Sequence, residues 1–270
     1  LPGLPVHLVQ ESLAAIKARH RAAARRREEA ARRRVVVAGT DVVWSLDATH
    51  LGRDTAGAEV QAQAVRDVAT TRTLAVAVGR PATAQDAVAV VRAAAAARGG
   101  RLPLVVATDN GPAYTSERFA GFLGDHGVVH LRSLPHTPRH NPWVERGHRD
   151  LKAETGLGRG VRDLDPAAAR RMIAAALERL DGHRLRRGLG YRTARAVDAE
   201  TPANYTAATR ALLVERVRRR TAHDAERPRT TREQRVLRRE AILAALEELG
   251  LITRTRGGRP TAAAKPDNIS

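Results

Sequence analysis

The segment from residue 104 to residue 112 reads Leu104-Val105-Val106-Ala107-Thr108-Asp109-Asn110-Gly111-Pro112. Its four leading apolar residues predict a short buried strand, and the Asn-Gly-Pro sequence predicts a sharp turn directly after it. Asp109 therefore falls at the carboxyl end of a strand, where α/β proteins collect ligands. Taken alone, such an aspartate more often begins an Asx-turn than performs chemistry.

A second acidic residue lies within the segment Trp44-Ser45-Leu46-Asp47-Ala48-Thr49-His50. Strand alternation places Trp44 and Leu46 on one face and Asp47 on the other. A charge inside such an apolar strand is costly unless it is paired or binds a cation, and the alternative is an edge strand with a hydrated face. His50 could bind phosphate or metal, although a surface histidine is the more ordinary interpretation.

A third acidic residue follows a proline-containing loop, in Pro138-Arg139-His140-Asn141-Pro142-Trp143-Val144-Glu145. Asn141 suits a helix N-cap and Pro142 the first helical turn. Glu145 then lies near the helix start, where the helix dipole favours an anion.

The predicted helix carries basic residues close to Glu145. Lys152 follows seven residues later, only about 20° from the direction of Glu145 around the helix axis. His148 and Arg149 lie beside this stripe. The alternative is a solvated charged helix face with ordinary ion pairs.

The spacing of the three carboxylates is more specific than any one of them. Between Asp109 and Glu145 lie 35 residues. This interval, together with the patterns Trp-x-x-Asp-x-Thr, Thr-Asp-Asn-Gly and Pro-x-x-Asn-x-x-x-Glu, resembles the Asp-Asp-Glu recombinase family, which includes retroviral-type integrases and bacterial insertion-sequence transposases. The resemblance covers about residues 40–155, and the tract Val65-Arg66-Asp67-Val68-Ala69-Thr70 also looks like the second strand of that family.

The resemblance implies an RNase H-like α/β fold, a mixed five-stranded sheet flanked by helices. It implies that Asp47, Asp109 and Glu145 converge on two divalent cations, Mg²⁺ or Mn²⁺, which suit carboxylate oxygen ligands. The residues that it makes candidates for DNA contact are Lys152, Asn141, His148, Arg149 and His50, with Asn141 equally suited to a capping role.

The activity implied is that of a DNA transposase or integrase, which cuts a DNA strand with a metal-activated water and then joins the freed 3′-hydroxyl to a target strand. The partners implied are double-stranded DNA, as element ends and target, and further copies of the chain in a homo-oligomer. Two alternatives remain open: an RNase H-like nuclease that only hydrolyses DNA, and a catalytically inactive DNA-binding regulator derived from a transposase.

Composition agrees with a nucleic-acid partner. The 270 residues include 47 Lys and Arg against 29 Asp and Glu, a net charge of +18, which favours a polyanion. The absence of cysteine excludes disulfides, Cys-ligated zinc and a thiolate nucleophile. Because no uncharged apolar run is long enough to span a membrane, we expect no membrane partner and a cytoplasmic location, at the nucleoid when bound to DNA.

The charge is concentrated in the flanks and suggests four domains. Residues 1–34 (net +6) predict a basic helical linker, with its helix at 11–34, and residues 35–157 (net +1) the catalytic core. Residues 158–209 (net +4) predict a helical extension, with a basic loop at 184–195. Residues 210–270 predict a basic C-terminal helical segment that is a candidate for DNA binding. Its end fits part of a winged helix, a minor-groove hook or a disordered tail. Because the chain begins with Leu1, we expect a DNA-binding domain upstream of it.

The predicted elements alternate through the middle of the chain. Helices are expected at 84–97, 116–126, 142–155, 166–180, 203–220 and 232–249. Strands are expected at 42–49, 59–68, 73–78, 104–107 and 128–131.

Overall fold

The computed structural model describes residues 6–31, 33–134, 142–223 and 230–256. It divides into two compact units, one made of residues 1–36 and 253–270 and the other of residues 37–252. The first unit contains helix α1 (Val6–Ala31) and most of the two-stranded pairing between β1 (Arg33–Val37) and β7 (Ile252–Arg256). Within the described residues, no helix is both long and apolar enough to cross a lipid bilayer.

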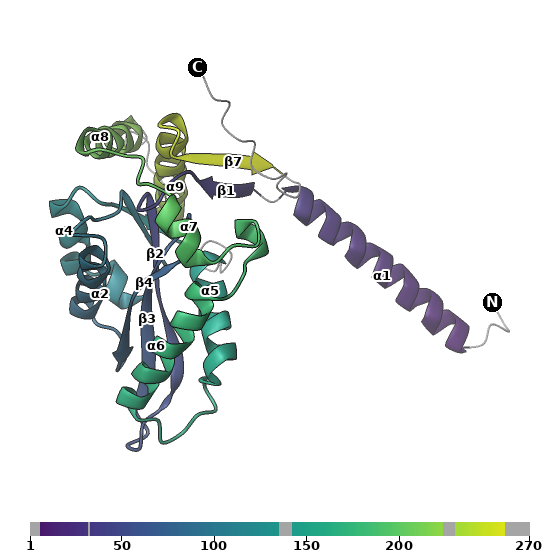
Figure 1. The fold of residues 1–270 in the computed structure, drawn as a ribbon. Helices are drawn as coiled ribbons and strands as arrows, with labels where there is room; N and C mark the ends of the chain where they lie inside the picture. Colours follow the sequence, from purple (N-terminus) through teal and green to yellow (C-terminus); the bar gives the residue numbers. More distant parts are fainter. Residues whose placement is uncertain (1–5, 32, 135–141, 224–229, 257–270) are drawn as a thin grey trace. The chain divides into compact units, whose positions relative to one another are not determined.

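The larger unit is built on a mixed five-stranded sheet, which confirms the predicted fold class (Figure 1). The strand order is β4-β3-β2-β5-β6, in which β2 pairs antiparallel with β3 and parallel with β5. The central position of β2 excludes an edge strand as the explanation for Asp47. The strands are β2 (Val43–Arg53), β3 (Glu59–Asp67), β4 (Thr73–Gly79), β5 (Val105–Thr108) and β6 (Val129–Arg132).

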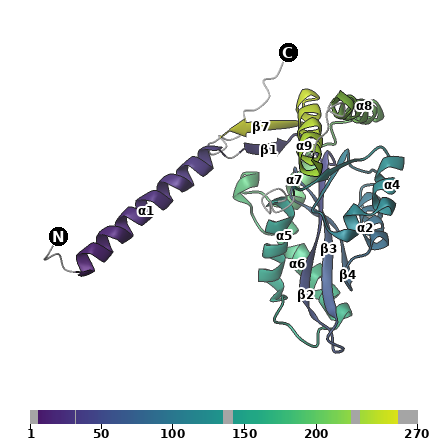
Figure 2. The ribbon, with the colours of Figure 1, turned by 180° about the vertical axis from the view of Figure 1, so that it is seen from behind.

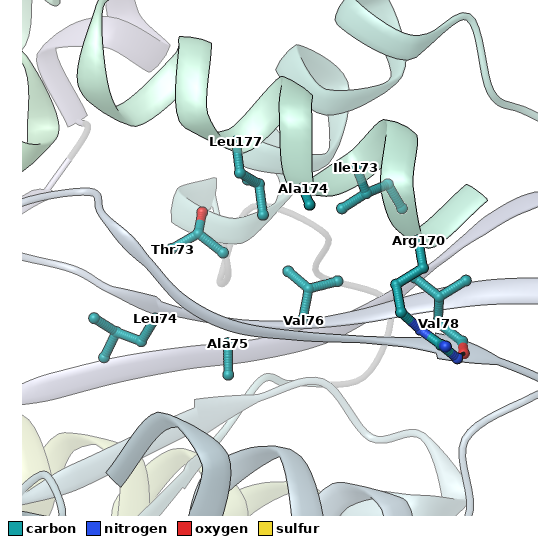
Figure 3. A pocket seen from close by; sticks show the side chains of 9 residues that line it. All are labelled: Thr73, Leu74, Ala75, Val76, Val78, Arg170, Ile173, Ala174 and Leu177. Carbon is teal, nitrogen blue, oxygen red and sulfur yellow. Dashed lines mark hydrogen bonds between the residues drawn. The ribbon is translucent and has the colours of Figure 1, made fainter. Parts of the chain in front are cut away.

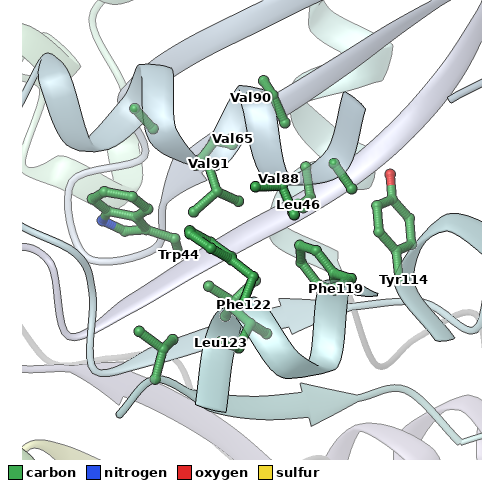
Figure 4. Close-up of a cluster of buried hydrophobic side chains, with 14 of the residues drawn as sticks. Trp44, Leu46, Val65, Val88, Val90, Val91, Tyr114, Phe119, Phe122 and Leu123 are labelled. Carbon is green, nitrogen blue, oxygen red and sulfur yellow. The ribbon is translucent and has the colours of Figure 1, made fainter. Parts of the chain in front are cut away.

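Helices cover both faces of this sheet (Figures 1 and 2). Helices α2 (Ala84–Ala96) and α4 (Glu117–Asp125) lie on one face, where Trp44 and Leu46 join the apolar core shown in Figure 4. Helices α5 (Pro142–Thr155) and α6 (Pro166–Gly182) cover the opposite face. Because side chains alternate along β2, Asp47 faces this second layer.

Helix α5 is held to the sheet by an apolar residue and by a glycine. Leu151 is 3% exposed and packs in the second core with Leu51 of β2. One turn earlier, Gly147 has no Cβ, which leaves room for the guanidinium of Arg66 from β3 directly beneath the helix. These contacts determine where α5 places Glu145 and His148.

The remaining helices complete the second layer and the C-terminal end of the larger unit. Helix α7 is anchored to the core through Asp198, which accepts from Thr70 at 3.0 Å and pairs with Arg72 and Arg98 at 2.5 Å each. Helices α8 and α9 pack against each other, and α9 also contacts β6. The elements not yet given are α3 (Pro112–Thr115), a 3-10 turn (Arg187–Leu189), α7 (Ala194–Glu200), α8 (Ala207–His223) and α9 (Thr231–Glu248).

Three expectations about these elements are wrong. Residues 33–34 lie in β1 rather than in the first helix, because the β-branched run 35–37 favours a strand and pairs with β7. The predicted basic loop ends early, since Thr193 caps α7 by accepting from the Ala196 amide. The next helix begins at Ala207 rather than 203, where Thr206 accepts from the Thr209 amide at 3.3 Å.

Candidate active site

Asp47 and Asp109 occupy matching positions on two adjacent parallel strands. Ser45 of β2 pairs with Ala107 of β5. Two residues further on lie Asp47, within β2, and Asp109, the first residue after β5. Neighbouring strands run about 4.8 Å apart, so the two carboxylates face the same side at the same level of the sheet. The predictions that Asp109 follows a short buried strand and that Asp47 lies inside a strand agree with this geometry.

One oxygen of each aspartate is held by a backbone amide. Oδ1 of Asp47 accepts from the Ala48 amide at 2.8 Å, and Oδ1 of Asp109 accepts from the Gly111 amide at 2.8 Å. The second bond is the Asx-turn that the sequence pattern allowed at this position. A turn residue and a functional carboxylate are therefore compatible, because Oδ2 of Asp109 takes no part in the turn.

The electrostatics of the pair favour a bound cation. Burial and the charge of Asp109 raise the pKa of Asp47 to about 7, and Glu145 adds to the increase, against a lowering by the Ala48 hydrogen bond. The side chain of Asp47 is only 20% exposed. Carboxylates that repel one another in a partly buried position are stabilised when a divalent cation offsets their charge.

Glu145 is the carboxylate that the structure leaves apart. It lies exposed in the first turn of α5, near enough to raise the pKa of Asp47. Across residues 6–31, 33–134, 142–223 and 230–256, no three or more His, Asp or Glu side chains are close enough together to hold a metal ion. The predicted convergence of three carboxylates is thus reduced here to a pair, Asp47 and Asp109, with Glu145 nearby.

His148 is the fourth group at this site. Its Nε2 lies 3.7 Å from Oδ2 of Asp47, beyond hydrogen-bonding distance, and this buried nitrogen has no hydrogen-bond partner among the described residues. Burial, with Lys152 and Arg66 nearby, lowers the pKa of His148 to about 4. The imidazole is therefore neutral at pH 7 and adjoins Asp47 without forming an ion pair.

The other predicted contact residues divide into three groups. Lys152 and Arg149 lie on α5 with Glu145, and Lys152 is half-buried, with a pKa lowered by burial and by Arg159. His50 alternates onto the opposite face of β2 from Asp47, where its Nε2 lies 3.7 Å from the Glu59 carboxylate, so the structure does not bring it to the site. Asn141 lies outside the described residues.

Two residues near the carboxylates have no counterpart among the sequence predictions. Arg66 lies between the sheet and α5 and contributes to the lowered pKa of His148. Tyr114, whose hydroxyl accepts from Nε2 of Gln63 at 3.1 Å, has a pKa raised first by burial and also by Asp47 and Asp109. Neither residue had a signal in the sequence, because the strand 59–67 carries several other polar and charged residues besides Arg66.

An apolar cavity in the larger unit is separate from this site. It measures about 240 Å³ and lies between β4 and α6, with an apolar lining that includes Val76, Ile173 and Leu177 (Figure 3). Neither aspartate lines it. The candidate active site is therefore distinct from this apolar cavity.

The mixed five-stranded sheet with helices on both faces has the architecture of an RNase H-like core. Residues 39–138 match the family model described as Integrase core domain. This part of the chain is thus similar to the core domain of integrases. The match ends before Glu145, and an origin in a bacterial insertion sequence stays a prediction.

Known relatives are similar over short stretches. An IgE-binding protein of Mus musculus is 51% identical over 51 residues, which cover 19% of this chain and 9% of that protein. The Intracisternal A-particle Pol-related polyprotein of mouse intracisternal a-particle MIA14 is 50% identical over 50 residues, 18% of this chain and 6% of the polyprotein. The chain therefore spans less than a tenth of the length of these relatives.

A solved structure shares the fold. It is a simian T-cell lymphotropic virus intasome in complex with the PP2A regulatory subunit B56 gamma, with a TM-score of 0.51 and 20% identity. The similarity covers 63% of this chain and 58% of that one. At this level of identity the likeness establishes the architecture of the core.

Proposed function

We propose that this chain is a DNA transposase or integrase that cuts DNA strands and transfers a 3′-hydroxyl end to a target strand. The observation that carries the proposal is the pair of carboxylates, Asp47 and Asp109, at the same level of two adjacent parallel strands. The integrase core match over residues 39–138 supports the same reaction class. Hard divalent cations prefer such oxygen ligands.

The cofactor is proposed to be Mg²⁺ or Mn²⁺, with two ions in each site. Asp47 and Asp109 fit a divalent ion because both offer carboxylate oxygens from one side of the sheet. Burial, and then repulsion by Asp109, raises the pKa of Asp47. Glu145 would complete the ligand set from the first turn of α5 once DNA is engaged. When bound, the ions supply charge that activates the attacking oxygen and stabilises the leaving one.

The protein residues would orient the reactants. Asp47 and Asp109 must be ionised to serve as ligands, and neutral His148 packs against Asp47 without competing for its charge. Lys152 and Arg149 project from the helix that carries Glu145, where they would contact phosphate groups of the bound strand. The site thus offers anionic groups for metal next to cationic groups for DNA.

The proposed reaction balances without a nucleotide cofactor. In the first step a water oxygen bonds to phosphorus, the bond from phosphorus to the 3′-oxygen breaks, and the released 3′-oxygen takes up a proton. In the second step that 3′-hydroxyl oxygen attacks a target phosphodiester, gives up its proton, and displaces a 3′-oxygen of the target. One phosphodiester bond forms as one breaks, so no external energy source is needed.

Double-stranded DNA, as element ends and target, is the proposed partner. A homo-oligomer on DNA is proposed because two ends must be held together before joining, and the solved relative is described as an intasome. The same proposal includes a cytoplasmic location at the nucleoid. It also includes four domains: a linker at 1–34, a core at 35–157, an extension at 158–209 and a C-terminal segment at 210–270.

The test is a strand-transfer assay with the full chain. Labelled short duplexes with free 3′-hydroxyls and varied end sequences are mixed with supercoiled plasmid and Mg²⁺ or Mn²⁺. A transposase or integrase yields label joined covalently to the plasmid. A nuclease that only hydrolyses yields nicked plasmid without joined label, and a DNA-binding regulator yields neither product.

The same assay tests the residues. Asp47→Asn and Asp109→Asn should each reduce joining at least about 100-fold, equivalent to about 3 kcal/mol of barrier. Glu145→Gln should have a comparable effect if it completes the ligand set. Asp125→Asn, an exposed carboxylate on α4, is the matched control and should retain activity. Full activity in both aspartate variants would disprove the assignment.

A further inference from the structure

A group of arginines gathers where α9 meets the edge strand of the sheet. Arg235, Arg238 and Arg239 lie three and four residues apart on α9, hence on one face of that helix. Nη1 of Arg239 donates to the backbone oxygen of Arg132 in β6 at 3.3 Å, which fixes this face against the end of the strand. We refer to Arg132, Arg235 and Arg238 as the β6–α9 arginine cluster.

The members of the cluster are close enough to repel one another. The pKa of Arg132 is lowered by burial and then by Arg235 and Arg238. The pKa of His130, two residues earlier on β6, falls to about 3 through burial, Arg132 and Arg238. Positive charges from the core strand and from the C-terminal helix therefore act on the same small region.

No carboxylate of the described part of the chain forms an ion pair with these three arginines. Burial lowers the pKa of Arg239, the residue that anchors the helix, and the charge of Glu240 partly offsets this lowering. Nε of Arg235 is buried without a hydrogen-bond partner among the described residues. A buried donor without a partner, surrounded by like charges, is unfavourable unless an anion satisfies it.

The position of the cluster relates it to the carboxylates. Arg132 pairs with Thr108 across β5 and β6, and Thr108 directly precedes Asp109. The cluster thus lies at the same end of the sheet as the carboxylate pair, one strand further toward the edge. A polyanion that reaches Asp109 has a cationic surface beside it.

From these contacts we propose that the β6–α9 arginine cluster binds the phosphodiester backbone of DNA next to the active site. Guanidinium groups bind phosphate oxygens in pairs of hydrogen bonds, which would satisfy the unpartnered Nε of Arg235. The inference rests on the proposed function, because it takes the DNA at the carboxylates as the same molecule. It assigns part of that contact to the C-terminal helix.

The test measures binding without catalysis. Fluorescence anisotropy of a labelled 30-base-pair duplex of arbitrary sequence is followed with the full chain in EDTA, over a range of KCl concentrations. Arg235→Gln with Arg238→Gln should weaken binding about 10-fold or more near 100 mM salt and reduce the slope of log K against log salt by about 2. Each lost phosphate contact removes about one unit of slope.

Two further double variants keep the result interpretable. Arg235→Lys with Arg238→Lys retains the charge and should retain most of the salt slope, even if affinity falls somewhat. Arg118→Gln with Arg171→Gln removes the same charge from exposed positions on α4 and α6 and is the matched control. Thermal midpoints of all three variants show that each is folded.

The possible results distinguish a failure of this inference from a failure of the proposed function. If the glutamine pair at 235 and 238 binds with the affinity and salt slope of the control pair, the cluster is not a DNA site, whatever the strand-transfer assay shows. If the unmodified chain binds no DNA in this assay, the proposed function fails and the inference fails with it. A selective loss in the glutamine pair, with charge-retaining lysines restoring the slope, supports the assignment.

Discussion

The guanidinium of Arg66 lies directly against the backbone of Gly147, so closely that a Cβ on Gly147 would overlap Nη1 and approach Cζ to 3.2 Å. Arg66 is 5% exposed, and its Nε donates to the Thr71 backbone oxygen at 2.6 Å, so the guanidinium cannot move away without losing that bond. This contact determines how closely α5 packs on the sheet. Glu145 and His148 flank Gly147 on the same helix.

Replacing Gly147 by alanine should displace α5 and reduce activity more than it reduces stability. The overlap costs about 1–3 kcal/mol, and the helix propensity of alanine returns about 1 kcal/mol. We expect a small decrease in the free energy of unfolding, measured by urea titration, and a loss of strand transfer of about 10-fold or more, because shifts of about 1 Å at a reacting group cost up to 100-fold.

Gly121→Ala is the control, because Gly121 lies in α4 and a Cβ there meets nothing within 4 Å. That variant should be slightly more stable than the unmodified chain and equally active. If Gly147→Ala behaves in the same way, the spacing between α5 and Arg66 has no role in the site.

The sequence predicted the sheet better than it predicted the site. Apolar runs and turn signals located all five strands of the sheet, and alternation placed Asp47 on the correct face, because these patterns follow from local backbone geometry. The position of Glu145 depends instead on how α5 packs over Arg66 and Leu151, which are contacts between distant segments. The strands β1 and β7 were missed for the same reason, since each is stabilised by a partner more than 200 residues away.

Asp198 should be essential for stability. It accepts hydrogen bonds from Arg98, Arg72 and Thr70, and its side chain is 2% exposed. Replacing it with alanine removes the carboxylate partner of Arg72 and leaves Arg98 paired with Asp41 alone, and breaking a buried pair costs about 3–5 kcal/mol. Urea titration at pH 7 measures the change.

The comparison for Asp198→Ala is Glu178→Ala, which breaks an exposed ion pair with Arg195. Exposed pairs contribute little because water and salt screen them, so the unfolding midpoint of this variant should be close to that of the unmodified chain. Equal effects of the two substitutions would show that the Asp198 cluster is not the anchor of α7.

His130 should make the protein less stable in mild acid. Burial, with Arg132 and Arg238, lowers its pKa to about 3, whereas the unfolded chain protonates a histidine near 6.5. Below pH 6.5 His130 is therefore protonated in the unfolded state but stays neutral in the folded state. The free energy of unfolding consequently falls as pH decreases toward 3. Between pH 7 and pH 5 this contribution is about 1–2 kcal/mol.

His130→Gln isolates that contribution, because His148 and every other group remain in both proteins. Glutamine does not titrate, so the variant lacks the acid-induced loss of stability that His130 causes. Between pH 7 and pH 5 the free energy of unfolding should therefore fall less in the variant than in the unmodified chain. Urea titrations at the two pH values provide the measurement. An unchanged difference would mean that His130 titrates near its ordinary pKa in the folded protein.

Divalent metal should stabilise the chain in a graded way that reflects the geometry of the carboxylates. A ligand at tenfold its dissociation constant adds about 1.4 kcal/mol to the free energy of unfolding, so Mn²⁺ or Mg²⁺ should raise the thermal midpoint of the unmodified chain. Asp47→Asn and Asp109→Asn should abolish this increase, because these carboxylates lie at the same level of adjacent parallel strands. Glu145→Gln should reduce it less in the absence of DNA, because Glu145 stands apart from the pair within the described structure.

Adding DNA should bring the effect of Glu145→Gln up to that of the aspartate variants, whereas Asp125→Asn should respond to metal as the unmodified chain does. Equal loss in all three variants without DNA would mean that the three carboxylates already form one site in solution, and no metal effect in any protein would contradict the proposed cofactor.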